Sequence, residues 1–139
     1  MRNTAIGSHA LFDNTADSNT AIGADALSAN TTGAFNVAIG GSALLDNTEG
    51  DNNRVVGVGA LSQSTGSGNT ALGRLAGANM TTADNVICIG SPGDGTAFAT
   101  SDRCFIGNIR GVTVGNLDGI NVIVDSDGQL GTSNSSRRF

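Results

Sequence analysis

The sequence predicts an all-β protein, a parallel β-solenoid of about seven coils of 16–17 residues, followed by a short β tail. Three observations predict it: a glycine that recurs every 16 or 17 residues, short segments that are apolar on both strand faces, and a composition rich in turn-forming residues. A unit this short cannot hold a helical hairpin repeat, which needs about 33 residues. It can hold one solenoid coil, which buries its apolar residues by stacking on its neighbours.

The repeat is anchored on the glycine of Asn-Thr-Ala-Ile-Gly and its variants. A bulky aliphatic residue precedes each glycine, and in the first five units an asparagine lies four residues before it. In these units an alanine follows at three residues and a threonine at eight. Agreement at several offsets over consecutive units indicates a true internal repeat. The anchoring glycines are Gly7, Gly23, Gly40, Gly57, Gly73, Gly90 and Gly107.

Each coil is expected to contain two short strands and two turns. The first strand is the segment before the glycine, such as residues 4–6, and the second is a short apolar pair such as Ala10-Leu11. We expect the asparagines of the Asn3 series to stack as an amide ladder along the solenoid. We expect the turn threonines to form a second ladder, because their hydroxyls can satisfy neighbouring backbone groups. These threonines are Thr15, Thr31, Thr48, Thr65 and Thr81.

The first strand of each coil is apolar on both faces. Successive strand residues point to opposite sides, so the small residues and the aliphatic residues point apart. Strands apolar on both faces are buried on both faces, and only one face can line the coil's own interior. We therefore expect a homotrimer, in which the two faces divide between coil interior and trimer axis; the sequence leaves open which face takes which place. The small residues are Ala5, Ala21, Ala38 and Ala71, and the aliphatic residues are Ile6, Ile22, Ile39, Val56, Leu72, Ile89 and Ile106.

Charge and hydropathy argue against two kinds of partner. Lys and Arg number 7 against 12 Asp and Glu, a net charge of −5, so the chain has little to neutralise phosphates and no nucleic acid partner is expected. No apolar run approaches the ~20 residues of a membrane span, so no membrane insertion is expected. The repeat begins at Asn3 without a leader segment, and we expect the chain to be part of a longer protein.

No residue pattern points to catalysis, a metal or a cofactor. His9 is the only histidine and has no second ligand at metal spacing, so we interpret it as a solvent-facing residue. Cys88 and Cys104 lie about one coil apart but at strand positions that face opposite ways, which disfavours a disulfide. The segment 91–95 contains Gly-x-Gly without a βαβ pattern and is interpreted as a lengthened turn. We expect no enzyme activity, no cofactor and no metal site.

Two protein families carry similar segments. The motif Asn-Thr-Ala-Ile-Gly at 19–23, with Ala26-Leu27 and Asn-Thr-Thr-Gly at 30–33, resembles the head repeats of trimeric autotransporter adhesins, whose similar core forms a left-handed trimeric β-roll. It resembles more closely the arrays of tail-fibre proteins that end in an endosialidase-type intramolecular chaperone domain. The segments 104–113, 122–132 and 135–139 are similar, in order, to the segments C-terminal to the array in those proteins.

The second resemblance implies a division of the chain. It gives a solenoid repeat array at 3–102, a C-terminal β neck at 103–134 and the stump of the chaperone junction at 135–139. In that family the chaperone domain holds three chains together during folding and is then released by self-cleavage. By resemblance, Ser135 is the junction nucleophile and the scissile bond comes directly after Asn134. The chain ends at Phe139, before the family's lysine, so the resemblance implies neither chaperone domain nor cleavage within it.

The functional expectation is a structural segment of a trimeric extracellular or virion fibre, either a tail-fibre shaft or an adhesin head. One alternative is a module that binds a cell-surface glycan or protein receptor, with specificity in outer turns such as 46–52 and 62–68. Another is an ice-binding solenoid, which is less favoured because the repeated threonines lie in turns and not in a Thr-x-Thr strand pattern.

Overall fold

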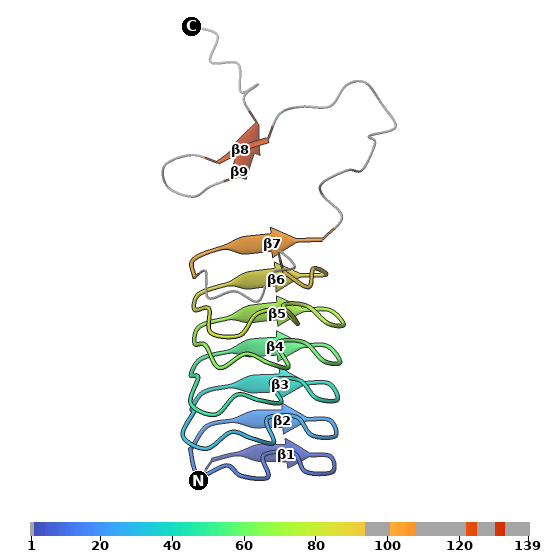
Figure 1. The fold of residues 1–139 in the computed structure, drawn as a ribbon, viewed down its shortest axis with the longest axis vertical. Coiled ribbons are helices and arrows are strands. Elements are labelled where there is room, and N and C mark those ends of the chain that lie inside the picture. The colour runs from blue at the N-terminus through green and yellow to red at the C-terminus, as the bar shows by residue number, and fades with distance from the viewer. Residues whose placement is uncertain (1, 94–100, 108–121, 125–129, 133–139) are drawn as a thin grey trace, which may run out of the picture.

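The computed structural model describes residues 2–93 and 101–107, and the backbone of residues 122–124 and 130–132. In these parts the protein is all-β, with seven parallel strands in one sheet that form a β-solenoid of about six turns (Figure 1). The predicted fold class is confirmed. The solenoid strands are β1 (Thr4–Ile6), β2 (Thr20–Ile22), β3 (Val37–Ile39), β4 (Arg54–Val56), β5 (Thr70–Leu72), β6 (Ile87–Ile89) and β7 (Cys104–Ile106). Separately, β8 (Val122–Val124) pairs antiparallel with β9 (Leu130–Thr132).

The solenoid strands stack in register, so that equivalent residues of successive coils lie above one another (Figure 1). Ala5 pairs with Ala21, and Ala21 with Ala38. Six spacings of about 4.8 Å give a stack roughly 29 Å tall. The sheet includes β7, which lies within the segment that the sequence analysis assigned to the neck.

The second strand expected in each coil is wrong for the described coils. The apolar pair after each glycine lies in a tight turn instead. Leu27, with φ 51°, and Leu44, with φ 52°, adopt the left-handed backbone conformation, which a strand does not use. Hydrogen bonds between coils nevertheless continue through the turns: the amide of Leu27 donates to the carbonyl of Ala43 at 3.0 Å. Turns therefore stack on turns much as strands stack on strands.

The recurring glycine is required by this close stacking. Gly40 has φ 133°, and a Cβ there would lie 2.6 Å from the carbonyl carbon and oxygen of Gly57 in the next coil. A side chain would thus meet rigid backbone in a conformation that L-residues rarely adopt. The glycine column fixes the point at which each strand bends into its turn.

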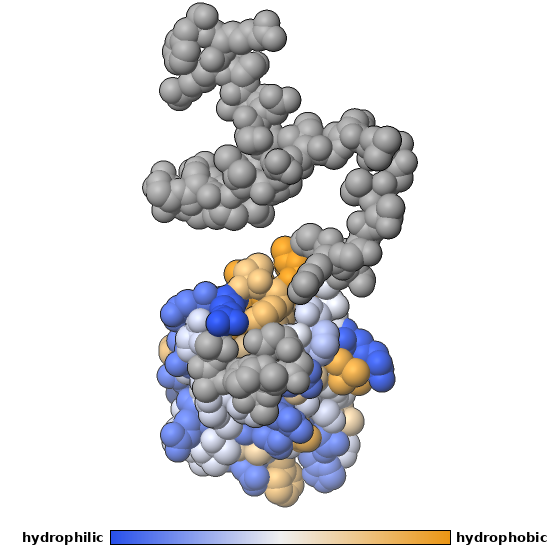
Figure 2. Space-filling model, turned by 45° about the horizontal axis from the view of Figure 1, so that its top comes forward, coloured by the Kyte–Doolittle hydropathy of each residue, from blue (hydrophilic) through white to orange (hydrophobic). Residues whose placement is uncertain are grey.

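The interior is thin and built mainly of small side chains. Each inner coil contributes the central strand residue, an alanine from the following turn and, in three coils, a leucine from the same turn. Figure 2 shows that hydrophilic residues make up most of the outer face in view, with hydrophobic residues in separate patches. The buried apolar residues are Ala21, Ala26, Leu27, Ala38, Ala43, Leu44, Val55, Ala60, Leu61, Ala71, Ala76, Met80, Ala83, Val86 and Cys88.

Candidate functional site

The strand face turned away from the interior carries one exposed or half-buried aliphatic side chain per coil. In β5 the central Ala71 is buried, and its neighbours Thr70 and Leu72 point outward. The structure therefore places the small residues inside the coil and the aliphatic residues outside; only Ala5, in the first coil, is exposed. We call the outer series the aliphatic column. It consists of Ile6, Ile22, Ile39, Val56, Leu72, Ile89 and Ile106.

A second outward column runs beside the aliphatic column and is more polar. It holds a threonine in β1, β2 and β5, and an arginine in β4. Arg54 and Val56 both point outward on either side of buried Val55. The guanidinium of Arg54 donates to the carbonyl of Asn52 at 3.3 Å, so this charge stays at the surface. The strand face is thus apolar along one side and mixed along the other.

An asparagine ladder runs through the stack just before each of the strands β1 to β5. The side-chain oxygen of Asn36 accepts the backbone N–H of Asn53 at 2.9 Å, and the oxygen of Asn53 accepts the N–H of Asn69 at the same distance. The amide group of Asn53 donates to the turn carbonyl of Gly66 at 2.9 Å. Each inner asparagine therefore links consecutive coils and also ties the turn of its own coil to the strand. The ladder comprises Asn3, Asn19, Asn36, Asn53 and Asn69.

The turn threonines also form hydrogen bonds between coils. The hydroxyl of Thr15 donates to the carbonyl of Thr31 at 2.8 Å, and that of Thr31 to the carbonyl of Thr48 at 2.9 Å. The hydroxyl of Thr65 donates to the carbonyl of Thr81 at 3.2 Å. These hydroxyl protons are directed into the stack and not toward solvent, which is the role of a structural turn ladder.

A third side-chain ladder was missed by the sequence analysis. It lies two residues before the asparagine series, and from Asp51 to Ser101 it alternates between aspartate and serine. The backbone N–H of Asp51 donates to the hydroxyl of Ser67 at 3.0 Å, and the N–H of Ser67 donates to the carboxylate of Asp84 at 2.7 Å. The N–H of Asp84 in turn donates to the hydroxyl of Ser101. The sequence signal that could have predicted this ladder is the recurrence of acidic and hydroxyl residues at this repeat position.

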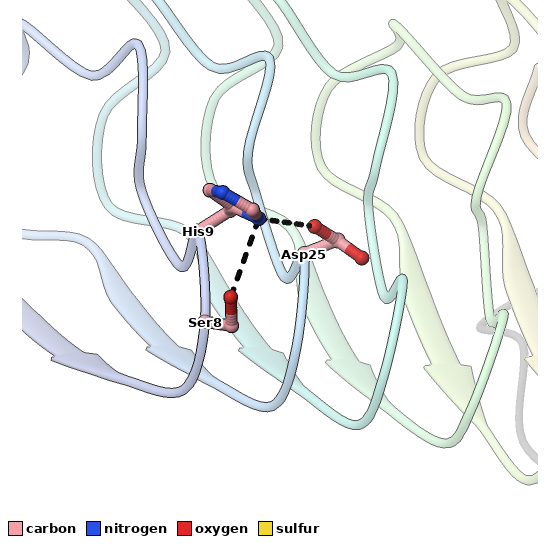
Figure 3. A network of polar contacts seen from close by, with 3 residues as sticks. All are labelled: Ser8, His9 and Asp25. Carbon is pink, nitrogen blue, oxygen red and sulfur yellow. Dashed lines mark hydrogen bonds and ion pairs between the residues drawn. The ribbon is translucent and has the colours of Figure 1, made fainter.

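A serine and a histidine of the first coil meet an aspartate of the second, but not as a catalytic triad (Figure 3). The hydroxyl of Ser8 and the carboxylate of Asp25 both approach the same ring nitrogen of His9, Nδ1, at 3.3 Å. A triad needs the nucleophile and the carboxylate on opposite nitrogens of the imidazole. The His9 side chain is 61% exposed and its ring packs edge-on against Phe12. The group is a surface contact between two coils.

The cysteines follow the alternation expected of strand residues. Cys88 is buried, Cys104 is exposed, and neither forms a disulfide. Among the described residues, no three His, Cys, Asp or Glu side chains gather closely enough to hold a metal ion. Within the same residues, no helix has the length and apolar character to cross a membrane.

The proposed junction residues Asn134 and Ser135 lie outside the described residues, as do residues 94 and 95 of the expected lengthened turn. Of that turn, residues 91–93 have no regular secondary structure. Comparisons of the chain with protein-family models, with curated proteins and with solved structures found no match.

Proposed function

We propose that this chain is a structural segment of a trimeric extracellular or virion fibre, of the tail-fibre shaft or adhesin-head type. The aliphatic column supports the proposal. Ile6 is 58% and Leu72 51% exposed in the single chain, and the column repeats over all seven strands. A continuous exposed apolar surface of this kind is typical of an interaction site.

Sister copies of the same chain are the partner that fits this surface. The column is straight and in register, so equal coils of identical chains can meet at equal heights. Three copies around a threefold axis would each cover the column of a neighbour with the same outer face. In this arrangement the small-residue face forms the interior of each chain and the aliphatic face forms the contact between chains.

The role in this proposal is mechanical. Every coil is bonded to the next through strand, turn and buried side-chain ladders, which resists bending and shear along the stack. Such a segment supplies length and stiffness and needs no cofactor, metal, nucleic acid or membrane insertion. It acts outside the cell or on the virion, joined to other parts of a longer fibre.

The mass in solution tests the proposal. Light scattering after gel filtration should give three times the 13.8 kDa of one chain for the natural sequence. Leu72→Glu places a charge in the aliphatic column and should yield single chains, because an unpaired charge in an apolar contact costs several kcal/mol. Phe12→Glu is the matched control, since Phe12 is 70% exposed but lies in a turn away from the strands. A single-chain mass for the natural sequence, or no effect of Leu72→Glu, contradicts the proposal.

A second candidate function is recognition of a cell-surface glycan, favoured by the phenylalanine at the turn between β2 and β3. Phe35 is 61% exposed and has φ 60°, a conformation uncommon for a bulky residue, and equivalent turns use Asn52 or Gly68. An aromatic ring held outward can stack on a sugar face. A glycan array compares the natural chain with Phe35→Asn, which suits the turn. Loss of a signal with Phe35→Asn supports recognition, and a blank array with the natural chain rejects it.

A further inference from the structure

A second column of side-chain amides, Asn14, Asn30 and Asn47, runs through the turns of the first three coils, and the last two are buried. In these two the amide nitrogen bridges two acceptors: the amide oxygen of the preceding coil and a turn carbonyl of its own coil. The nitrogen of Asn30 donates to Asn14 Oδ1 at 2.6 Å and to the Gly33 carbonyl at 2.8 Å. The nitrogen of Asn47 donates to Asn30 Oδ1 at 2.9 Å and to the Gly50 carbonyl at 3.0 Å.

The column changes chemistry in the fourth coil, where Ser64 takes the place of the asparagine. Ser64 and Asn47 are both fully buried. Neither the hydroxyl of Ser64 nor the side-chain oxygen of Asn47 has a hydrogen-bond partner among the described residues. The turn carbonyl of Gly66 accepts one side-chain amide, that of Asn53, whereas the equivalent carbonyl of Gly50 accepts two. Compared with the preceding coils, one donor to the Gly66 carbonyl and to Asn47 Oδ1 is therefore missing where Ser64 replaces the asparagine.

We propose that this point is a binding site for one buried water molecule. The water oxygen would stand where the amide nitrogen stands in the preceding coils. It would donate one hydrogen to Asn47 Oδ1 and the other to the Gly66 carbonyl, and it would accept the hydroxyl hydrogen of Ser64. Three hydrogen bonds are the usual number for a buried water. Replacing asparagine by serine also frees a volume on the order of that of one water molecule, about 30 Å³ in the liquid.

The next coil along the stack explains why the polar column ends at this point. In the fifth coil the equivalent residue is Met80, whose sulfur lies 3.6 Å from the sulfur of Cys88. The column thus passes from amides to apolar sulfur-containing side chains. Asn47 supplies the last amide oxygen, and the water with Ser64 completes its hydrogen bonding before the apolar part begins. The water is a structural ligand of the fold, held by side chains that only the stacking brings together.

The sign of one substitution tests the site in the full chain. If the water is present, Ser64→Ala removes one of its three hydrogen bonds and lowers the unfolding midpoint by about 3–6 °C. If the hydroxyl has no partner, the same change removes a buried unsatisfied group and leaves the midpoint unchanged or raises it. Ser62→Ala is the control, because Ser62 is half-buried in the same turn and its side chain makes no comparable buried contact.

A crystal structure of the natural chain supplies the second measurement. Density for one water within hydrogen-bond distance of Asn47 Oδ1, the Gly66 carbonyl and Ser64 Oγ supports the site. A direct bond between Ser64 Oγ and Asn47 Oδ1, or an empty gap, overturns it. In Ser64→Asn the new amide nitrogen should occupy the water position. A water that persists beside that amide would overturn the assigned geometry.

Discussion

Truncating one asparagine of the buried ladder should destabilise the solenoid far more than truncating a surface asparagine. In Asn53→Ala the N–H of Asn69 loses its acceptor and the Gly66 carbonyl loses its only side-chain donor among the described residues. Asn53 is fully buried. The unsatisfied N–H of Asn69 costs about 1–3 kcal/mol, and the Gly66 carbonyl, which would keep the proposed water as a donor, adds less. Asn79→Ala, at an exposed position, should change the free energy of unfolding by less than about 0.5 kcal/mol.

Equilibrium unfolding in guanidinium chloride, followed by far-ultraviolet circular dichroism, measures both variants on the same scale. The comparison is made at one protein concentration, because any association between chains adds to the apparent stability. A loss below about 1 kcal/mol in Asn53→Ala would show that the ladder does not satisfy groups that are otherwise isolated from water. The structural reasoning about the buried amides would then be refuted.

The near-isosteric change Asn53→Asp separates the two halves of the amide. The acceptor for the N–H of Asn69 is kept, but the donor is replaced by a carboxylate oxygen that faces the Gly66 carbonyl and Asn36 Oδ1. Burial beside two acceptors raises the pKa of the new carboxyl in the folded state above its unfolded value of about 3.9. A raised folded pKa means that the variant approaches the natural chain near pH 4 and loses stability as the pH rises. A difference that is constant from pH 4 to 8 would contradict this.

Three further predictions concern individual contacts. Gly40→Ala should lower the unfolding midpoint by 10 °C or more, on the order of 2–4 kcal/mol, because the new Cβ meets backbone at 2.6 Å. At the adjacent Gly41 the nearest atom to an added Cβ is 3.8 Å away, so Gly41→Ala should be tolerated. Equal midpoints for the two variants would contradict the stacking argument. Thr31→Val removes the hydrogen bond from the hydroxyl to the Thr48 carbonyl but keeps the shape of the side chain. Chemical denaturation should therefore show a free energy of unfolding lower by about 0.5–1.5 kcal/mol. An unchanged free energy of unfolding would mean that the threonine ladder does not stabilise the turns. The buried thiol of Cys88 should react with iodoacetamide only after unfolding, as peptide mass mapping can show, and rapid labelling of the native chain would place Cys88 on the wrong face.

The spacing of the glycines was enough to predict the solenoid and the strand of each coil. Alternation within the strands also predicted that small and aliphatic residues point apart, as at Ala71 and Leu72. It could not say which side faces inward, because both are apolar. The structure decides this for a single chain: the central strand residue, alanine in Ala21, Ala38 and Ala71, is buried, and the aliphatic residue after it is exposed or half-buried.

The turns were harder to predict because their conformation runs against residue preference. Leu27 and Leu44 are bulky residues in the left-handed region, so their sequence indicates a strand. The signal was present elsewhere in the repeat, since glycine replaces the leucine at Gly77. A position occupied by leucine in some coils and by glycine in another is one where the backbone, and not the side chain, is under constraint. Comparing coils position by position would have exposed this, whereas each coil considered alone did not.

The buried asparagines and the exposed aliphatic column of this solenoid have a common cause. Eight of the fifteen buried apolar residues are alanine, whose burial yields less than about 1 kcal/mol each. Backbone closely stacked around so thin a core leaves buried N–H and carbonyl groups beyond the reach of the strand ladder, and asparagine satisfies a donor and an acceptor at once. The interior takes its larger aliphatic side chains from the turns, at Leu27, Leu44 and Leu61, and the aliphatic residues of the strands stand on the outer strand face. Apolar side chains of the aliphatic column therefore stay exposed in the single chain, and burying them would be the main gain of the assembly proposed above.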